Sequence, residues 1–195
     1  AGACALIAQG VEAGGHVLGT TRLQELIPAV CSIAGDVPVA AAGGLATAED
    51  IKQVFALGAR AAVFGTRFVA TTESNAHRNY KAAIVNALED TTVRTECFDG
   101  AWPNAPHRVL RNSTFTTWEK AGSPAPPNRP GEGDVILHTA NGQSIPRYFI
   151  SPPAQGMTGE IEAAVMYAGT GIGKIQDNPA VATLIEEIRV DLLAG

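Results

Sequence analysis

The feature that most constrains the fold is a repeated order of short apolar run, glycine-containing loop and helix-like segment. The apolar runs lie at residues 3–8, 37–42 and 61–64, and each ends at a loop that contains glycine. Continuous apolar runs of this length are typical of parallel strands that are buried on both faces. Helical periodicity at residues 21–34 and 47–57 separates the runs. The alternation of strands with helices predicts a parallel α/β sheet.

Both helix-like segments carry signals for where they begin, bend or end. In residues 21–34 the apolar positions recur at spacings of three and four, but Pro28 interrupts them, so we expect a kink or a break there. Thr47 can cap the second helix, and Asp50 three residues later forms a variant of the capping box. Gly58 follows as a C-terminal stop.

Beyond residue 73 the segments become more varied. We predict helices at residues 77–88, 114–121, 160–167 and 179–193, with glycines between the last two. No internal repeat is visible apart from the strand–helix period of the first part.

A hairpin is expected after the proline- and glycine-rich loop at residues 123–133. Two β-prone runs, residues 135–140 and 143–150, flank Asn141-Gly142, which is the strongest short signal for a hairpin. Pro146 cannot donate to a ladder, so the second run is an edge strand or not a strand.

Charge and cysteine content argue against several classes of function. The net charge of −5 argues against nucleic acid or an anionic membrane as the main partner. No run reaches the ~18 apolar residues of a membrane-spanning helix, and no basic segment precedes an apolar one as in a signal peptide. Three cysteines, Cys4, Cys31 and Cys97, lie far apart, which indicates a reduced, cytoplasmic setting. The chain opens at Ala1 directly into an apolar run, so we interpret it as a fragment or a chain without its front half.

Three loops, residues 10–16, 42–44 and 65–68, follow the predicted strands. In a parallel barrel such loops open on one face, where active sites form. Glycine lets backbone N–H groups approach a phosphate closely, and Thr66 would add a hydroxyl donor. The alternative is that the glycines only serve tight turns. Because two such loops follow each other along the chain, we favour phosphate binding.

The helix after Gly43 and Gly44 limits where that phosphate can lie. Glu49 and Asp50 occupy its first turn, and their charge would repel an anion at the helix end. We therefore expect the anion to contact the loop amides, Gly65 and Thr66.

His16 is the candidate catalytic base. Its ordinary pKa of about 6.5 suits a base near neutral pH. A single loop histidine is often only a surface residue, but its place beside the predicted phosphate face favours a functional role. His77, His107 and His138 show no metal-ligand spacing with it, so we assign no metal.

Several segments together resemble one enzyme family. Residues 8–16 resemble the signature loop of the nitronate monooxygenase (2-nitropropane dioxygenase-like) family. Residues 41–45 and 56–59, followed by 65–68, are similar to its two FMN-phosphate segments. Two further segments are similar to later parts of many members: residues 102–108 and 167–173. The resemblance covers nearly the whole chain.

This resemblance implies the C-terminal part of an FMN-binding (β/α)₈ TIM barrel, about the last three βα units, with an appended hairpin and helical segment. The barrel part would span residues 1–122, the proline- and glycine-rich excursion with its hairpin 123–158, and helices packing back on the barrel 159–195. His16 would be the base or a flavin-site residue. The implied FMN-binding residues are Gly14, Gly15, Ala42, Gly43, Gly44, Gly65 and Thr66.

The leading hypothesis is oxidation of an alkyl nitronate by FMN and O₂ to a carbonyl compound and nitrite. The first alternative is an NAD(P)H-dependent flavin reductase of quinones or enoyl thioesters. The second alternative is a truncated, non-catalytic fragment. In each case we expect the unpaired edge strands of a three-stranded sheet to associate with a missing N-terminal half or with another copy.

Overall fold

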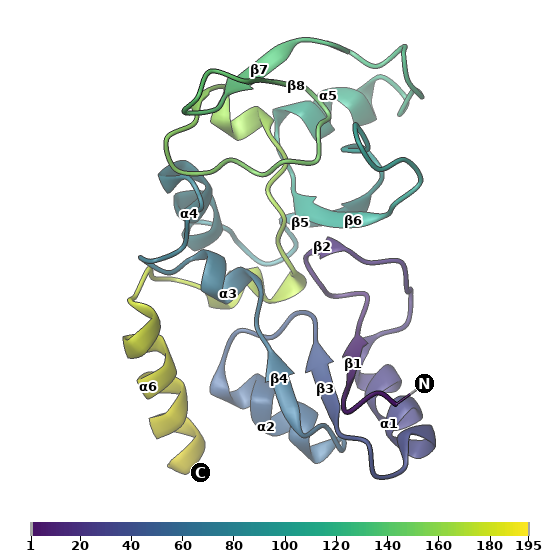
Figure 1. The fold of residues 1–195 in the computed structure, drawn as a ribbon, viewed down its shortest axis with the longest axis vertical. Coiled ribbons are helices and arrows are strands. Elements are labelled where there is room, and N and C mark those ends of the chain that lie inside the picture. The colour runs from purple at the N-terminus through teal and green to yellow at the C-terminus, as the bar shows by residue number, and fades with distance from the viewer. Residues whose placement is uncertain (1, 195) are drawn as a thin grey trace.

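The chain forms two bodies that lie one above the other in Figure 1. This computed structural model describes residues 2–194. Ala1 and Gly195, which limit the predicted segments 1–122 and 159–195, lie outside the described residues. One body holds three parallel strands and the helices packed on them. The other holds two antiparallel sheets. Apart from one short early strand, β2 (Gly15–His16), the chain builds the first body, crosses to the second and returns to the first near its end (Figure 1).

The parallel sheet contains β1 (Leu6–Gln9), β3 (Val39–Ala42) and β4 (Ala61–Val63), in the order β1-β3-β4. All three predicted strands are confirmed, each somewhat shorter than expected. Gln9, Ala42 and Val63 lie side by side in the register. The three strands therefore end at one edge of the sheet, and the loops that follow them open there.

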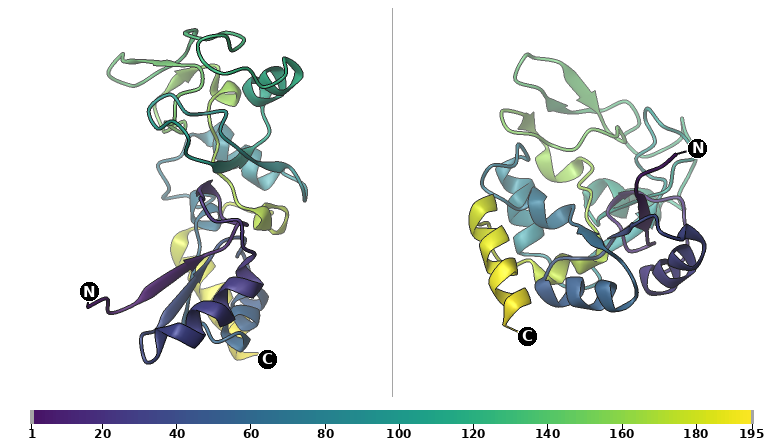
Figure 2. Two further views of the ribbon diagram at one scale, coloured as in Figure 1. Left: turned by 90° about the vertical axis from the view of Figure 1, so that its right-hand side faces the viewer. Right: turned by 60° about the horizontal axis from the view of Figure 1, so that its bottom comes forward.

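Helices α1 (Leu23–Ala34) and α2 (Ala48–Ala56) cover one face of this sheet. Ile27 and Val54 pack there against Ala41. On the opposite face Ile7 is 67% exposed and Val63 is 40% exposed. The strands were expected to be buried on both faces, but within residues 2–194 only the face under the helices is buried. Strand β1 lies at the edge of the sheet, and no other strand of the described chain pairs with its outer side (Figure 2).

The predicted break at Pro28 is wrong, because α1 runs through it as one helix. Proline removes a single intrahelical hydrogen bond, and the fully buried Ile27 beside it holds the helix on the sheet. The capping box of α2 is confirmed: the Asp50 amide donates to Thr47 Oγ1 at 3.3 Å, and the Thr47 amide donates to the Asp50 carboxylate at 3.0 Å. Gly58, at φ +105°, follows the end of α2 as predicted.

The second body contains an antiparallel sheet that the sequence did not indicate. It consists of β2 (Gly15–His16), β6 (His107–Leu110) and β5 (Thr92–Thr95), in the order β2-β6-β5. The two-residue strand β2 brings the predicted glycine loop into this sheet. His16 is thereby fixed opposite His107.

The predicted hairpin is confirmed in the second antiparallel sheet. Strands β7 (Val135–His138) and β8 (Ser144–Pro146) pair around Asn141-Gly142, and β9 (Thr158–Gly159) pairs with the other side of β7. Strand β8 is thus an edge strand, as its proline requires.

The predicted helix at residues 160–167 is wrong. Only the short 3₁₀ turn η1 (Ile161–Ala163) forms, and the chain then runs extended beside β6, where the Leu110 amide donates to the Met166 carbonyl at 2.8 Å. Residues 163–166 are buried, and other partners replace the helical hydrogen bonds of their carbonyls. Thr114 and Asn112 donate to the carbonyls of Ala163 and Ala164, and β6 donates to that of Met166. The glycines that follow form the 3₁₀ helix η2 (Thr170–Lys174).

The remaining helices complete the two bodies. Helices α4 (Arg78–Val85) and α6 (Val181–Leu193) lie within predicted helical segments, and α5 (Ser113–Lys120) begins one residue before its predicted segment. The short α3 (Thr66–Val69) was not predicted. Helix α6 packs against α2 in the first body. No helix in residues 2–194 is long and apolar enough to cross a membrane.

Candidate functional site

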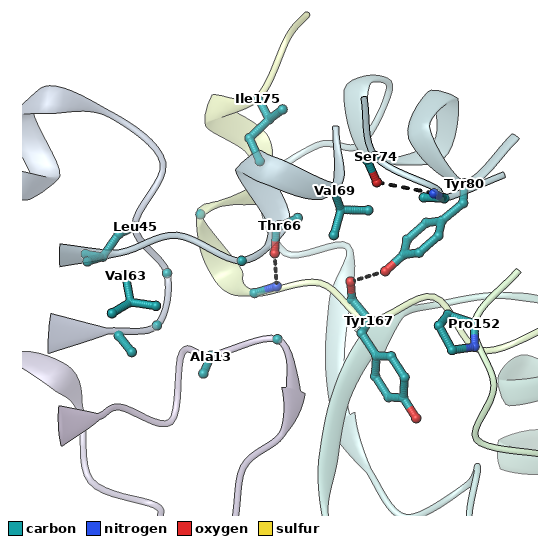
Figure 3. Close-up of a pocket in the computed structure, with 18 of the residues that line it drawn as sticks. Ala13, Leu45, Val63, Thr66, Val69, Ser74, Tyr80, Pro152, Tyr167 and Ile175 are labelled. Carbon is teal, nitrogen blue, oxygen red and sulfur yellow. Dashed lines mark hydrogen bonds between the residues drawn. The ribbon is translucent and has the colours of Figure 1, made fainter. Parts of the chain in front are cut away.

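A cavity of about 510 Å³ opens where the ends of the parallel strands face the second body (Figure 3). All three loops that follow the parallel strands line it. Six of the predicted FMN-binding residues are brought together in its wall: Gly14, Ala42, Gly43, Gly44, Gly65 and Thr66. Gly15 and His16 are not among the lining residues.

Two of these glycines are required by the backbone. Gly43 and Gly44 have φ of +119° and +71°, a region that side chains rarely adopt. A Cβ on Gly44 would also lie 2.9 Å from Thr170 Oγ1 and 3.0 Å from Glu12 Cβ. The conformation of the turn therefore requires glycine at both positions, whatever else the loop binds.

Gly65 has a different reason to lack a side chain. Its φ of −106° is open to any residue, and no heavy atom lies within 4 Å of the position that a Cβ would take. Gly65 is exposed and is one of the residues that line the cavity. The chain's own packing does not demand glycine here, whereas a ligand lying close to the backbone would.

Unused backbone donors gather at this wall. Within residues 2–194, the amides of Gly43, Gly44, Gly65 and Thr66 donate to no other group of the chain. Thr66 Oγ1 accepts from the Gly169 amide at 3.0 Å, which leaves its hydroxyl hydrogen free to donate (Figure 3). Such a set of N–H and O–H donors fits a phosphate group.

Sequence reasoning missed a fourth wall, which comes from the C-terminal part of the chain. Gly169 and Gly171 line the cavity and pack directly on the first two loops. A Cβ on Gly169 would lie 2.8 Å from the Glu12 carbonyl oxygen, and one on Gly171 would collide with the carbonyl group of Gly44. The alternate glycines at residues 169–173 were the available signal.

The acidic residues of α2 do not oppose an anion as strongly as expected. The buried Asp50 carboxylate accepts hydrogen bonds from the Ala46 and Thr47 amides and from Lys174 Nζ. Burial pushes the pKa of this carboxyl up, but the hydrogen bonds from Lys174, Ala46 and Thr47 outweigh it and hold the pKa below its usual range. Its charge is paired with that of Lys174, while Glu49 is exposed on the surface.

No side-chain cation lines the cavity within residues 2–194. Arg67, next to Thr66 in sequence, is buried and pairs with Asp177 at 2.8 Å. A phosphate at this wall would therefore be held by backbone and hydroxyl donors, in the manner of an anion-binding loop.

The far wall of the cavity is largely apolar and comes from the second body and its connections. Residues 74–76 pair with residues 152–155 through an Ala76–Ala154 bridge and main-chain hydrogen bonds. Val69, Pro152 and Ile175 face the space beside them (Figure 3). The cavity thus has a polar backbone end and an apolar end, as a site for a phosphate-bearing ring cofactor would need.

His16 does not line the cavity but lies beside Tyr167, which does. The centroid of its imidazole is 5.7 Å from the ring centroid of Tyr167 and 4.4 Å from that of Trp102. His16 Nε2 is buried and has no hydrogen-bond partner within residues 2–194. Burial lowers the pKa of His16, which favours the neutral imidazole that a base requires.

The neighbouring histidine differs in this respect. His107 is completely buried; its Nε2 accepts from the Phe98 amide and its Nδ1 lies 2.9 Å from the Ala105 carbonyl. Both ring nitrogens of His107 therefore contact the backbone, whereas Nε2 of His16 has no hydrogen-bond partner among the described residues. In the described part of the chain, no three histidine, cysteine or acidic side chains form a metal-binding group.

The model of the nitronate monooxygenase family matches residues 1–191. The chain belongs to this family. Nitronate monooxygenase from Pseudomonas aeruginosa is 32% identical over 97% of the chain and 52% of its own length. A Rhodococcus jostii relative, named as a dehydrogenase of an octahydroindene-carboxyl-CoA, is 38% identical over 63% of the chain and 33% of its own length.

Two solved structures are similar to nearly the whole chain. Nitroalkane oxidase from Streptomyces ansochromogenes has a TM-score of 0.69 and 30% identity, covering 99% of this chain and 52% of its own. FabK from Thermotoga maritima has a TM-score of 0.70 and 28% identity, covering 99% of this chain and 55% of its own. The chain therefore spans about half the length of these barrel relatives, as part of a barrel would. The family match and the relatives confirm the resemblance that the sequence motifs indicated. Nitronate monooxygenases are flavin-dependent oxidoreductases.

Proposed function

We propose that this chain forms the phosphate side of the FMN site in an enzyme that oxidises alkyl nitronates with O₂ to a carbonyl compound and nitrite. The observation that carries the proposal is the set of unused amides of Gly43, Gly44, Gly65 and Thr66 at the ends of parallel strands. Backbone donors at this position of a barrel are suited to a phosphate.

The residues of the cavity fit FMN at its phosphate end. The four amides and the Thr66 hydroxyl would hold the phosphate, and the open space at Gly65 leaves room for its approach. When bound, FMN supplies the redox chemistry, and the protein supplies binding and orientation.

His16 would act on the substrate rather than on the phosphate. With a neutral nitroalkane, the free Nε2 removes the acidic α-proton. An anionic nitronate has already lost that proton, so His16 then only positions it. The aromatic rings of Trp102 and Tyr167 lie against the imidazole, and burial lowers its pKa.

The three βα units would be the last three of the eight-unit barrel. In the described chain β1 and β4 each pair only with β3, and one sheet face is open. We expect further strands, from an N-terminal half or another copy, to cover these edges.

The test is direct. The purified protein is examined for a flavin absorbance band and then supplied with a preformed nitronate and O₂. Formation of nitrite and carbonyl compound in equal amounts supports the proposal. A flavin-loaded protein that yields neither product from nitronates refutes the assigned reaction.

A second candidate function is redox chemistry on a thioester with NAD(P)H as reductant. It is favoured by the Rhodococcus jostii relative, which is named for a carboxyl-CoA substrate. Anaerobic mixing with NADH separates the two candidates. Rapid bleaching of the flavin supports the reductase, and slow or absent bleaching supports the nitronate oxidation.

A further inference from the structure

The loop between β5 and β6, residues 96–106, places an indole over the imidazole of His16. His107 pairs with both His16 and Thr95, so this loop leaves and re-enters the sheet close to His16. The ring of Trp102 stacks on that of His16 with centroids 4.4 Å apart and an interplanar angle of 27°.

The base of this loop is held by buried groups, while its tip is exposed. Phe98 is bound through its amide to His107, and Arg129 binds both the Cys97 carbonyl and the Asp99 carboxylate. Residues 101–104 at the tip are exposed. A fixed base therefore presents an indole from an otherwise exposed turn.

Core packing does not explain this tryptophan. Trp102 is 55% exposed and belongs to none of the three apolar clusters found in residues 2–194. Its ring contact is with His16, whose Nε2 is buried and has no hydrogen-bond partner in the described part of the chain. The other tryptophan, Trp118, packs instead against an apolar cluster and donates to the Pro124 carbonyl.

We propose that Trp102 is a positioning residue for His16: its indole holds the imidazole against Tyr167 and His107 and keeps water from Nε2. The inference rests on the proposed role of His16 as a base. The stacked ring therefore maintains a neutral imidazole in a fixed orientation until a substrate arrives.

Two effects of the indole on His16 oppose each other. A π face attracts an imidazolium, which favours the charged form. Exclusion of water disfavours that form, and the lowered pKa of His16 follows from burial. His107 and Tyr167 lie directly against the ring, and Arg108 pairs with Gly15 beside it. The charged groups that act on His107 and Arg108 are Glu12, Arg94, Glu96 and Asp99. No carboxylate forms an ion pair with His16 among the described residues, so water exclusion decides the direction.

The test is an NMR titration of the His16 imidazole, whose signal is assigned by its loss in His16→Asn. In Trp102→Ala we expect the pKa to move up toward the ordinary value of about 6.5, because water reaches Nε2. Trp102→Phe should keep the parent titration, since it retains a stacked ring. Trp118→Phe is the matched control and should leave it unchanged. An unmoved or lowered pKa in Trp102→Ala overturns the inference.

Tryptophan fluorescence gives an independent readout. An imidazolium stacked on an indole quenches its emission, so emission should fall as the pH drops through the pKa of His16. That step should be absent in His16→Asn. If the parent and His16→Asn show the same pH profile, the rings are not stacked in solution and the inference fails.

Turnover separates this inference from the proposed function. Trp102→Ala should lower turnover of a neutral nitroalkane by up to ~10²-fold, since displacement of a reacting group by about 1 Å can cost that much, and Trp102→Phe should restore most of it. If Trp102→Ala moves the titration but His16→Asn leaves turnover intact, the positioning role stands and the base assignment fails. If the titration does not move, the positioning role fails whatever the turnover shows.

Discussion

Lys174 Nζ donates to the buried carboxylate of Asp50 at 2.5 Å, across 124 positions of sequence. This contact joins η2, which carries Gly171, to α2, which follows the Gly43 and Gly44 loop. It fixes the fourth wall of the cavity onto the first body. The relationship also explains how an acidic residue can lie close to the proposed phosphate site.

Replacing Lys174 should destabilise the protein in a pH-dependent way. Lys174→Met should lower the free energy of unfolding by about 1–2 kcal/mol at pH 7, because it removes a charge-assisted hydrogen bond of a half-exposed lysine. The folded pKa of Asp50 lies below its unfolded value of about 3.9, so this stability is present above that pH and is lost as the pH falls through the folded pKa. Urea unfolding of the parent and Lys174→Met at pH 7 and pH 3 measures the loss of stability and its dependence on pH. Lys120→Met, on the exposed end of α5, should have little effect at either pH.

Gly65 offers a cleaner test of phosphate binding than Gly44. Gly65→Val should leave thermal stability nearly unchanged, because its backbone angles are ordinary and no atom is close, yet lower FMN affinity about tenfold or more by filling the cavity. Gly44→Val should impair both, because of its positive φ and its contact with Thr170. FMN titration and thermal melting of the same samples separate the cases. Glu49→Ala is the control, and parental affinity in Gly65→Val would contradict the assignment.

His16→Asn should distinguish the two forms of the substrate. Turnover of a neutral nitroalkane should fall by ~10² to 10⁴, the usual contribution of a general base, while a preformed nitronate should lose much less. In the parent enzyme, nitroalkane turnover should decline only as the pH falls below the ordinary histidine range, because burial lowers the pKa of His16. Steady-state rates over a pH series measure both effects. Equal losses with the two substrates would assign His16 to positioning alone.

The open face of the parallel sheet should drive association. A polypeptide of these 195 residues should self-associate in size-exclusion chromatography, since β1 and β4 have unpaired edges and Ile7 is largely exposed. Ile7→Lys should weaken this association. Leu88→Lys, at an equally exposed position outside the sheet, should leave it unchanged. A parent monomer that binds one FMN would show that the sheet needs no further strands.

The local signals in the sequence were sufficient for much of the fold. The three strands, the capping box of Thr47 and Asp50, and the hairpin at Asn141-Gly142 depend on neighbours in sequence, and all are confirmed. The strand ends then brought six of the predicted site residues into one wall.

What the sequence did not reveal depends on distant contacts. Strand β2 has only two residues, and its pairing with β6 joins positions about 90 residues apart, so no local pattern marks it. Residues 164–167 were predicted as helix but run extended, because β6 offers Met166 and Tyr167 a partner. The role of Gly171 is likewise visible only beside Gly44.

The route of the chain between the two bodies has a consequence for the order of folding. The loops after the parallel strands are made before most of the second body, and the segment that closes over them comes only after it. Closing so long a stretch of chain is entropically costly unless that stretch is already compact. The nascent protein should therefore be unable to hold its cofactor until the second body has folded. Flavin capture would then be a late event, and it would report that both bodies have reached their native arrangement.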